Sequence, residues 1–420
     1  MVRRIWFGVM GLILMGSLCA ETIELGPEED WFRVLHGDHL APGTVVELRS
    51  GTYSDPRRLS IGHAGTERDP IVVRAKLGHD VVFQRPDARQ NTINLEGAQF
   101  LTIEGVEITG GAAGVRIQKG HGRMPRHVSL LSLHIHHVGG VAVTCNESGT
   151  TYREMLFQGN HIHHTGGHGE GFYLGANNDR DGNTTAVLRD SVIEQNYIHN
   201  LNGPQISQGD GIEIKDGSFG NVIRDNRIHD TKYPGIIVYG TDGNAPNVIE
   251  RNAIWNSGDH GIQAAADAII RNNIVSNVRS DGIRSKKHQS AGVGALRIVN
   301  NTIVDANGSG IRVDALNPAG KRVVVANNAV LTRTPLRLPA KTDRVIAVDN
   351  ETRGKPTKLL RDFYPVAGSS LIGRANVDFL PIDDFDGRRR AGTADIGAYR
   401  FSAAGPARRY DAYSFDDDRK

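Results

Sequence analysis

The sequence has 420 residues, with 49 lysines and arginines against 47 aspartates and glutamates, 50 glycines and 6% aromatic residues. A charge balance this even gives no electrostatic basis for binding nucleic acid or a membrane surface, and we expect neither as a partner. The many glycines and the scarcity of helix-forming runs indicate a chain with many tight turns.

Residues 1–20 have the features of a secretory signal peptide. Arg3 and Arg4 form a basic start, and the apolar stretch from Ile5 to Leu18 is short for a bilayer span and precedes a plausible cleavage site. We therefore expect export to the periplasm or the extracellular space, without membrane attachment after cleavage; a membrane anchor is the alternative. Cleavage leaves Cys145 as the one cysteine, so an intrachain disulfide is excluded.

An internal repeat dominates the rest of the chain. One element is an asparagine two positions before an apolar residue, and it begins at Asn160, Asn196, Asn226, Asn252, Asn272, Asn301 and Asn328. A second element is a glycine followed by apolar residues at alternate positions, and it begins at Gly114, Gly140, Gly171, Gly211, Gly235, Gly261, Gly282 and Gly310. The spacing is irregular, which suits a coil of short parallel strands whose stacking buries the apolar face.

An asparagine at one phase of every unit favours parallel coils over antiparallel hairpins, because stacked amides can bond to each other and to the turn backbone. The sequence therefore predicts an all-β, single-domain, right-handed parallel β-helix, which we expect to be a monomer. Its expected parts are an N-terminal cap with the first coils over 21–113, the repeats over 114–331, an irregular closing segment over 332–400 and a flexible tail over 401–420.

The period of two within each strand separates inward from outward residues. The first inward column is expected to hold Val115, Val141, Phe172, Ile212, Ile236, Ile262, Ile283 and Ile311. The second is expected to hold Ile117, Val143, Leu174, Ile214, Val238, Ala264, Ser285 and Val313. Residues between and after these then form outer ladders, with about 4.8 Å between neighbouring coils.

Several stretches resemble a known family. Three stretches of the N-terminal part resemble the opening coils of bacterial β-helix polysaccharide lyases, the alginate lyase and chondroitinase B relatives. They are VELRSGTY at Val46–Tyr53, GTERDPIVVR at Gly65–Arg74 and FLTIEGVEI at Phe100–Ile108. Near the other end, FDGR from Phe385 and DIGAY from Asp395 resemble the closing strand of secreted β-helix proteins. The resemblance covers most of residues 42–400 and implies the same fold.

One of these matches bears on chemistry. The stretch IEIKDGSFGN, from Ile212 to Asn221, is similar to the strand that carries the proton-abstracting lysine in those lyases, and Lys215 falls on that position. The family places an arginine on the next coil, where this sequence has Tyr239. The resemblance implies β-elimination on a polymer that contains uronic acid, with Lys215 as base and Tyr239 as acid, or the reverse.

The outer ladder predicts a binding face around the same residues. Glu213 and Lys215 alternate on one strand, with aromatic rings on the coils before and after. We expect an acidic polysaccharide to be bound along this face by Tyr173, Glu213, Gln263, Arg284, Lys286 and Arg116. Insertions flank these coils, at 163–170, 175–190 and 201–210, and in solenoids such insertions tend to build the binding face; idle surface loops are the alternative.

The chemistry of each candidate has an ordinary alternative. Lys215 acts as a base if burial lowers its pKa, but it can equally be an exposed lysine paired with a neighbouring carboxylate. His168 and His260, at the edge of the face, can serve as acid or base or can cap turns. Asp210 and Glu213 offer oxygen ligands for Ca²⁺, although two carboxylates are few for a dedicated calcium site.

A histidine patch lies outside this candidate site. His134 and His136 fall on outer phases of one coil, and His161 and His163 repeat them on the next. His199 and His229 extend one column. Such a patch can bind a transition metal, although the spacing is not a zinc signature, and a stacked ladder tolerated by the fold is the alternative.

Other functions remain open at the level of sequence. A uronan C5-epimerase shares the proton abstraction, and a non-catalytic glycan-binding protein would need only the face. A glycoside hydrolase needs two carboxylates across the scissile bond. The outer-column carboxylates Glu213 and Asp314 are expected four coils apart, so only loop residues such as Glu170 and Asp210 could complete a pair.

Overall fold

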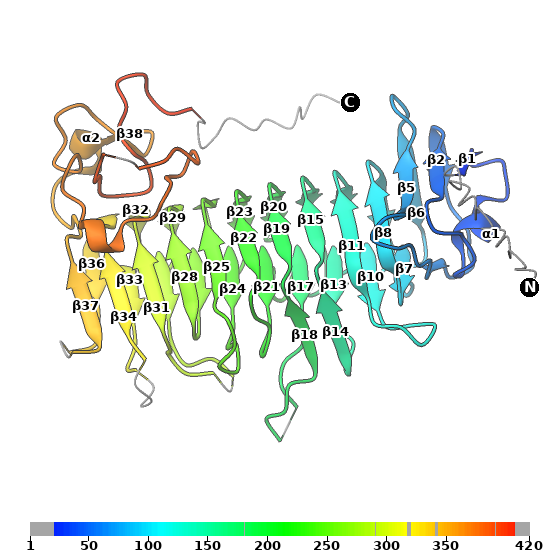
Figure 1. The fold of residues 1–420 in the computed structure, drawn as a ribbon, viewed down its shortest axis with the longest axis horizontal. Helices are drawn as coiled ribbons and strands as arrows, with labels where there is room; N and C mark the ends of the chain where they lie inside the picture. The colour runs from blue at the N-terminus through cyan, green and yellow to red at the C-terminus, as the bar shows by residue number, and fades with distance from the viewer. Residues whose placement is uncertain are drawn as a thin grey trace, which may run out of the picture.

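A computed structural model describes residues 21–407, apart from 180, 290, 317–320, 341–342 and 391. The predicted signal peptide, residues 1–20, and most of the predicted tail, residues 408–420, lie outside the described residues. The chain forms a stack of coils along one long axis, from blue at the N-terminal end to orange at the other (Figure 1). The predicted right-handed parallel β-helix is confirmed.

Each coil contributes one strand to each of three parallel sheets. Sheet 1 runs through β1 (Thr22–Leu25), β2 (Val45–Leu48), β5 (Ile71–Ala75), β8 (Gln99–Glu104), β11 (Arg126–Leu131), β15 (Leu156–Gln158), β19 (Val192–Glu194), β22 (Val222–Arg224), β25 (Asn247–Glu250), β28 (Ala268–Arg271), β31 (Leu296–Val299), β34 (Val323–Ala326) and β37 (Val345–Val348). Two further strands, β14 (Thr150–Arg153) and β18 (Ala186–Arg189), pair with each other beside it.

Sheet 2 carries the candidate site. It runs through β4 (Ser60–Ile61), β7 (Ile93–Glu96), β10 (Val115–Gln118), β13 (Val143–Cys145), β17 (Phe172–Leu174), β21 (Ile212–Ile214), β24 (Ile236–Val238), β27 (Ile262–Ala264), β30 (Ile283–Ser285), β33 (Ser309–Val313) and β36 (Thr334–Arg337).

Sheet 3 carries the histidines. It runs through β3 (Gly51–Tyr53), β6 (Val81–Arg85), β9 (Glu107–Gly110), β12 (His134–His136), β16 (His161–His163), β20 (Tyr197–Leu201), β23 (Arg227–Thr231), β26 (Ala253–Trp255), β29 (Ile274–Val278), β32 (Thr302–Ala306) and β35 (Ala329–Leu331). The three sheets enclose one apolar core of stacked isoleucine, leucine, valine and phenylalanine side chains.

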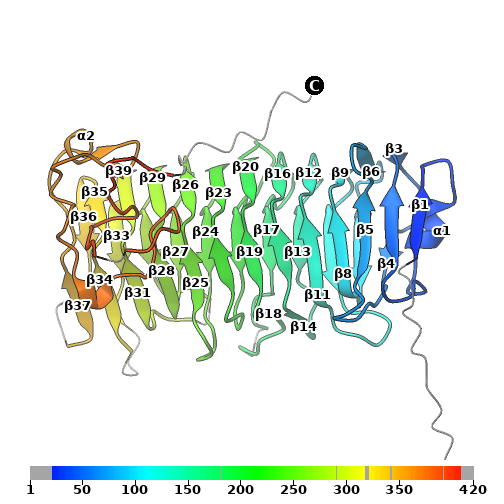
Figure 2. The same ribbon diagram turned by 45° about the horizontal axis from the view of Figure 1, so that its top comes forward.

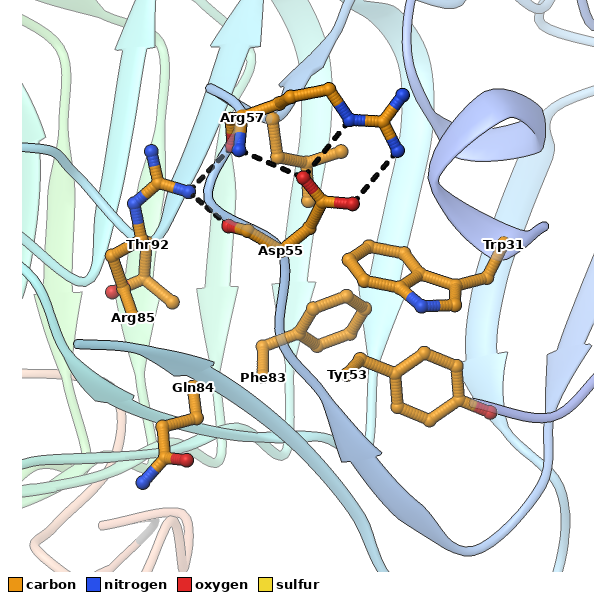
Figure 3. Close-up of a pocket in the computed structure, with 9 residues that line it drawn as sticks. Trp31, Tyr53, Asp55, Arg57, Phe83, Gln84, Arg85 and Thr92 are labelled. Atoms are coloured by element: carbon orange, nitrogen blue, oxygen red, sulfur yellow. Dashed lines mark hydrogen bonds and ion pairs between the residues drawn. The ribbon is translucent and has the colours of Figure 1, made fainter. Parts of the chain in front are cut away.

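The N-terminal end of the core is closed by aromatic residues. Helix α1 (Trp31–Leu35) places Trp31 edge-on against Tyr53 and Phe83, with ring centroids 5.4 and 5.9 Å apart (Figure 3). Arg85 donates from Nη1 to the carbonyl oxygens of Asp55 and Arg57, at 2.6 and 2.5 Å. Large rings and a tied loop therefore cover the apolar end that the first coil would otherwise expose to water.

The C-terminal segment folds back along sheet 3, as the turned view shows (Figure 2). It includes α2 (Pro356–Leu359), β38 (Leu360–Arg361), β39 (Tyr364–Pro365) and a 3₁₀ turn at Val377–Phe379. Its Tyr364, Phe385 and Tyr399 pack with Ala253 and Ile274 of sheet 3. The first residues of the predicted tail join this packing, because Phe401 lies 6.2 Å from the Tyr364 ring, measured between centroids.

Stacked asparagines tie each coil to the next inside the core. Asn226 donates from Nδ2 to Asn252 Oδ1 at 3.0 Å and to the carbonyl oxygen of Ile193 at 2.9 Å. Its own Oδ1 accepts the backbone and side-chain N–H groups of Asn196, at 3.0 and 2.9 Å. The same pattern repeats along the ladder of Asn160, Asn196, Asn226, Asn252, Asn273, Asn301, Asn328 and Asn350. This ladder satisfies buried polar groups that the turns leave open.

One predicted member of this ladder is wrong. Asn273, and not Asn272, accepts from Asn252. Asn272 precedes it in a left-handed backbone conformation, with φ at 55°, and donates to the carbonyl oxygen of Asp383 at 2.9 Å. The sequence pattern pointed to the wrong residue because Asn272 and Asn273 are both asparagine. The turn needs one residue at positive φ immediately before the ladder position, and Asn272 fills that place.

Both inward columns are also corrected at one coil, where Val143 belongs to the first column and Cys145, not Val143, to the second. Val143, and not Val141, pairs with Val115 and with Phe172, so Val143 and Cys145 occupy the inward positions of β13. Ala142 takes the corner that glycine holds in neighbouring coils; at Gly171, a Cβ would lie 2.6 Å from the carbonyl oxygen of Gly211. The strand starts two residues later than predicted because Gly139 and Gly140 are used in a close backbone contact with the previous coil.

We expect Asn226→Ala to lower the free energy of unfolding by about 2–4 kcal/mol, because it strands buried backbone and amide groups on three coils. Urea unfolding followed by circular dichroism measures the loss. The exposed Asn202→Ala is the matched control and should change the free energy of unfolding by no more than about 0.5 kcal/mol. An equal loss in both variants would mean that the ladder adds no particular stability.

Candidate functional site

The candidate site lies on the outer face of β17, β21 and β24, midway along the stack (Figure 1). Tyr173 pairs with Glu213 in register, as the period of two predicts. Tyr239 follows β24, and its backbone N–H donates to Ile214, which places it beside Lys215 on the neighbouring coil. Parallel stacking thus brings residues more than twenty positions apart in sequence to one spot.

The side chains of Glu213, Lys215 and Tyr239 form a closed triangle. Lys215 Nζ lies 2.5 Å from Glu213 Oε1 and 3.1 Å from the hydroxyl oxygen of Tyr239. The Tyr239 hydroxyl in turn donates to Glu213 Oε1 at 2.8 Å. Lys215 Nζ also lies over the rings of Tyr173 and Tyr239, 4.6 and 4.7 Å from their centroids. The alternative of an exposed lysine is therefore wrong, because the residues of the triangle are 4–5% exposed, whereas its pairing with a neighbouring carboxylate, Glu213, is observed.

Two further carboxylates stand next to this triangle. Glu170 and Asp210 each precede a column glycine, and the N–H of Gly171 donates to the carbonyl oxygen of Asp210, so the two residues stack on neighbouring coils. Oxygens of Glu170, Asp210 and Glu213 all lie within 4.8 Å of one another, and all three residues are buried. We call these three carboxylates, with Tyr173, Lys215 and Tyr239, the Lys215 centre.

Burial sets the protonation of this centre. It raises the pKa of Asp210 well above its usual range, and the negative charges of Glu213 and Glu170 raise it further. The pKa of Glu170 is raised mainly by burial. Burial is the largest single influence and would lower the pKa of Lys215, but Glu213, Tyr173 and Asp210 together outweigh it and the net pKa is raised. Burial and Glu213 also raise the pKa of Tyr239, so the resting centre holds an ammonium and a neutral phenol.

The cluster suits an oxygen-loving cation such as Ca²⁺. Glu170 Oε2 is buried and makes no hydrogen bond to any described residue, so it has ligand capacity to spare. Three carboxylates around one point are the donors that Ca²⁺ prefers, and a divalent cation would offset their mutual repulsion. The sequence named Asp210 and Glu213 as ligands; the structure adds Glu170.

The remaining predicted residues spread along the same face. Gln263 lies two coils beyond Glu213, with Ile237 between them. Arg284 follows on the next coil and is held by Asp281 and Asp314, at 3.2 and 2.8 Å. Lys286, on the same strand end as Arg284, is half-buried. Arg116 lies on the other side, two coils before Tyr173.

The two histidines differ in their places. The His168 side chain is 70% exposed and its Nδ1 lies 3.7 Å from Glu170, at the rim of the Lys215 centre. His260 is buried two coils beyond Asp210, and its Nδ1 accepts the backbone N–H of Asp281 at 3.1 Å. Burial lowers the pKa of His260 despite the carboxylates of Asp259 and Asp281 nearby. It therefore stands one coil away from Tyr239 rather than in the Lys215 centre.

Sequence reasoning missed three contributors. Glu170 was named only as part of a possible hydrolase pair, and Asp281 not at all, although each stands immediately before a column glycine as Asp210 does. That position was a usable signal, because it recurs at the same corner of successive coils. His288 was also missed; its ring lies 4.6 Å from that of Tyr239 and belongs to a loop that only the folded chain brings back over the site.

Comparison with known proteins agrees with this architecture. The sequence matches the family described as the right-handed beta helix region over residues 83–246 and 189–330, which together span more than half of the chain. The chain belongs to the right-handed β-helix family. A comparison with curated proteins gave no match. Among the described residues, no helix is long and apolar enough to cross a membrane.

Solved β-helix structures are similar in fold. The chain covers 96% of the pectate lyase Pel9A, which covers 91% of this chain, at 14% identity and a TM-score of 0.54. The chain covers 94% of XylC, solved in complex with xylose, and XylC covers 86% of this chain, at 10% identity and a TM-score of 0.53. The chain covers 58% of the PL6 family alginate lyase AlyGC, which covers 86% of this chain, at 15% identity and a TM-score of 0.51. At such identities the similarity shows the fold, which confirms the resemblance to β-helix lyases at that level.

We expect Asp210→Asn to stabilise this β-helix increasingly as pH rises. A carboxyl whose pKa is raised on folding costs nothing below its unfolded pKa, near 3.9, and destabilises the fold progressively above it. Asparagine keeps the shape and removes that cost. Thermal unfolding of both proteins should show coincident midpoints near pH 4 and a higher midpoint for the variant at pH 7. A pH-independent difference would contradict the assignment of a raised pKa to Asp210.

Proposed function

We propose that this β-helix protein acts on a polysaccharide that contains uronic acid and cleaves it by β-elimination at the Lys215 centre. The single observation that carries the proposal is the buried contact of an ammonium, a phenol and a carboxylate on the outer face of sheet 2. Perturbed, buried titratable groups of this kind gather at functional sites. The fold shared with pectate and alginate lyases, and the export predicted from residues 1–20, are consistent with such a substrate.

β-Elimination needs one group that removes the proton on the carbon next to the uronate carboxylate and one that protonates the departing oxygen. Lys215, as the neutral amine, takes that proton; the electron pair forms the carbon–carbon double bond as the glycosidic carbon–oxygen bond breaks. Tyr239 gives its hydroxyl proton to the leaving oxygen. Lys215 Nζ lies 3.1 Å from the Tyr239 oxygen, so the proton then passes between them and both groups return to their starting forms.

The resting Lys215 is an ammonium because of Glu213, so its role as base depends on that charge being offset. Glu170, Asp210 and Glu213 would hold a calcium ion, which would supply positive charge beside the substrate carboxylate. If the Glu213 charge were offset in this way, less would oppose the lowering of the Lys215 pKa by burial. Arg284, Lys286 and Arg116 would bind further carboxylates along the polymer.

The geometry disfavours a glycoside hydrolase. In retaining enzymes the two carboxyl groups stand about 5–5.5 Å apart and in inverting enzymes about 6.5–9.5 Å apart, on either side of the scissile bond. Here one oxygen each of Glu170, Asp210 and Glu213 lie within 4.8 Å of one another. Such a cluster shares protons or a cation more readily than it spans a sugar ring. A C5-epimerase and a glycan-binding protein remain as the outcomes against which the lyase is tested.

The purified protein should raise ultraviolet absorbance, through the unsaturated uronate, with at least one polymer of a panel of alginate, pectate, glucuronan and glycosaminoglycans. We expect Lys215→Ala to abolish the rise, at least 100-fold, because removal of a general base costs about that much or more. Lys76→Ala, which removes a surface lysine paired with Glu24, is the matched control and should retain full activity. Proton exchange from solvent without absorbance would indicate an epimerase, and binding alone a glycan-binding protein.

Calcium should stabilise the wild-type protein and not a variant that lacks one ligand. In Glu170→Gln the cluster loses one charge, so we expect the Ca²⁺-dependent rise of the thermal midpoint to shrink to less than half. Calorimetric titration of chelator-treated protein gives the affinity independently of activity. Glu67→Gln, at an exposed position between β4 and β5, serves as the control and should respond to Ca²⁺ as the wild type does. An equal response of all three proteins would contradict the calcium site.

A further inference from the structure

The outer face of sheet 3 carries an unusual concentration of imidazoles. Eight of the seventeen histidines of the chain lie on it or at its turn, at His134, His136, His137, His161, His163, His164, His199 and His229. In register, His134 pairs with His161, and His136 pairs with His163, which pairs with His199. We call the set His134, His136, His161, His163 and His199 the imidazole patch. It lies on a different sheet from the Lys215 centre.

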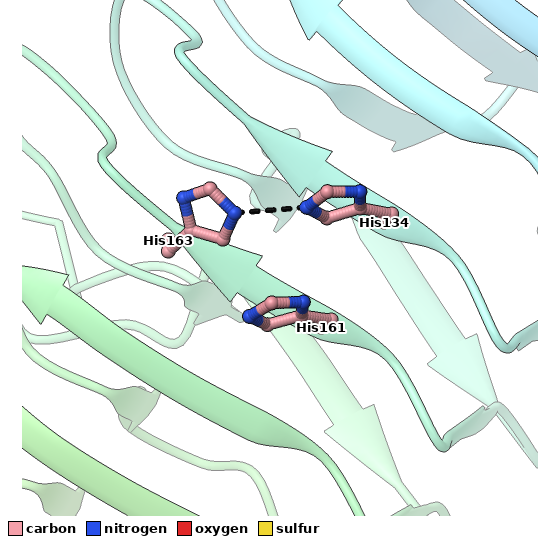
Figure 4. A group of neighbouring side chains, drawn as sticks. All are labelled: His134, His161 and His163. Atoms are coloured by element: carbon pink, nitrogen blue, oxygen red, sulfur yellow. Dashed lines mark hydrogen bonds between the residues drawn. The ribbon is translucent and has the colours of Figure 1, made fainter. Parts of the chain in front are cut away.

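The rings of the patch stack along the coils and meet across them. His134 lies nearly parallel to His161 at 4.8 Å between centroids, with 6° between the ring planes, and His136 and His163 repeat this at 5.0 Å and 6°. Across the coils, His134 Nε2 lies 2.8 Å from His163 Nε2 (Figure 4). His134 Nε2 and His163 Nε2 therefore face each other across the coils, within hydrogen-bond distance.

The third ring completes a ligand set. One nitrogen each of His134, His161 and His163 lie within 4.8 Å of one another, and these side chains are half-buried, so an ion can reach them. A fourth imidazole is close, because His199 Nε2 lies 2.8 Å from His161 Nε2. Glu107, His134 and His136 form a second, adjoining group, in which one ligand atom of each residue also lies within 4.8 Å of the others.

These nitrogens suit a metal with right-angled bonds. With metal–nitrogen bonds of about 2.0–2.1 Å, two ligands at a right angle stand about 2.9 Å apart and two at a tetrahedral angle about 3.3 Å. His134 Nε2 and His163 Nε2, which are joined by a hydrogen bond of 2.8 Å, are close enough to take adjacent positions of the tetragonal geometry that Cu²⁺ and Ni²⁺ prefer.

The position of the patch distinguishes it from packing. Farther along sheet 3, the same outer column continues with Trp255 stacked on His229, and there the C-terminal segment covers the sheet. The aromatic column is thus used for packing at β26. At β12 and β16 the column switches to half-buried histidines, where the rings face each other through nitrogen atoms instead of an apolar partner.

We propose that His134, His161 and His163 form a binding site for one divalent transition-metal ion, with Cu²⁺ preferred and Ni²⁺ next. His199 stands ready as a fourth imidazole ligand. This site is independent of the carboxylate cluster, whose oxygen donors select a different class of cation.

The test uses the full chain without a histidine tag, freed of metal by a chelator. Calorimetric titration should show tight binding of one Cu²⁺ per chain, and electron paramagnetic resonance should show hyperfine splitting from several nitrogen ligands. Millimolar Ca²⁺ should not displace the copper, which separates this site from the Glu170–Asp210–Glu213 cluster.

The double variant His134→Gln with His163→Gln should bind Cu²⁺ at least tenfold more weakly and lose the nitrogen splitting. The matched control, His39→Gln with His79→Gln, removes two histidines outside sheet 3 and should bind as the wild type does. Single His161→Gln provides a second test if the double variant does not fold, as judged by circular dichroism. Absence of Cu²⁺ binding by the wild type, or unchanged affinity in the patch variants, would overturn the proposal.

Discussion

Hydrogen bonds between stacked asparagine side chains hold the coils of this protein in register. Each amide accepts from the coil before it and donates to the coil after it, and each also caps a backbone carbonyl inside the core. Apolar packing alone would tolerate sliding by two residues, since every second side chain is apolar. A buried amide has no such freedom, because a slip would leave its donors and acceptors without partners in a dry interior. Both functional faces depend on that register.

The Lys215 centre gains its properties from this rigid background. Its three carboxylates and one ammonium are buried on strands and corners whose backbone is already fixed. Like charges held together in this way destabilise the fold, which raises the pKa of Asp210 and Glu170. The regular coils on either side supply the stability that offsets the repulsion between these buried carboxylates.

The strand period predicted much of the site. Once the coil is recognised, alternation alone brings Tyr173, Glu213 and Lys215 to one face, and stacking brings Tyr239 to their side. The errors, at Val141 and Asn272, arose where a pair of similar residues left the start of a strand ambiguous by one or two positions. Only backbone contacts between coils resolve such a choice.

Corners and loops explain what the sequence did not reveal. Whether Glu170 or Asp281 points toward the site depends on the turn before each glycine, and the period of two does not extend through a turn. His288 reaches Tyr239 through a loop whose path is set by contacts far along the chain. The histidines of the imidazole patch could be predicted from their spacing in the sequence. Which ring nitrogens face each other depends on the side-chain rotamers, which the spacing does not determine.

Because of the asparagine ladder, the length of this β-helix can change in steps of one whole coil. Every rung offers the same donors above and the same acceptors below, so a segment from one ladder asparagine to the next could be duplicated or lost while the rungs on both sides rejoin. The Lys215 centre lies in the middle of the stack, and the aromatic residues that close the core lie at its N-terminal end. A lineage could therefore lengthen or shorten its binding face by whole coils on either side of the centre without rebuilding the chemistry.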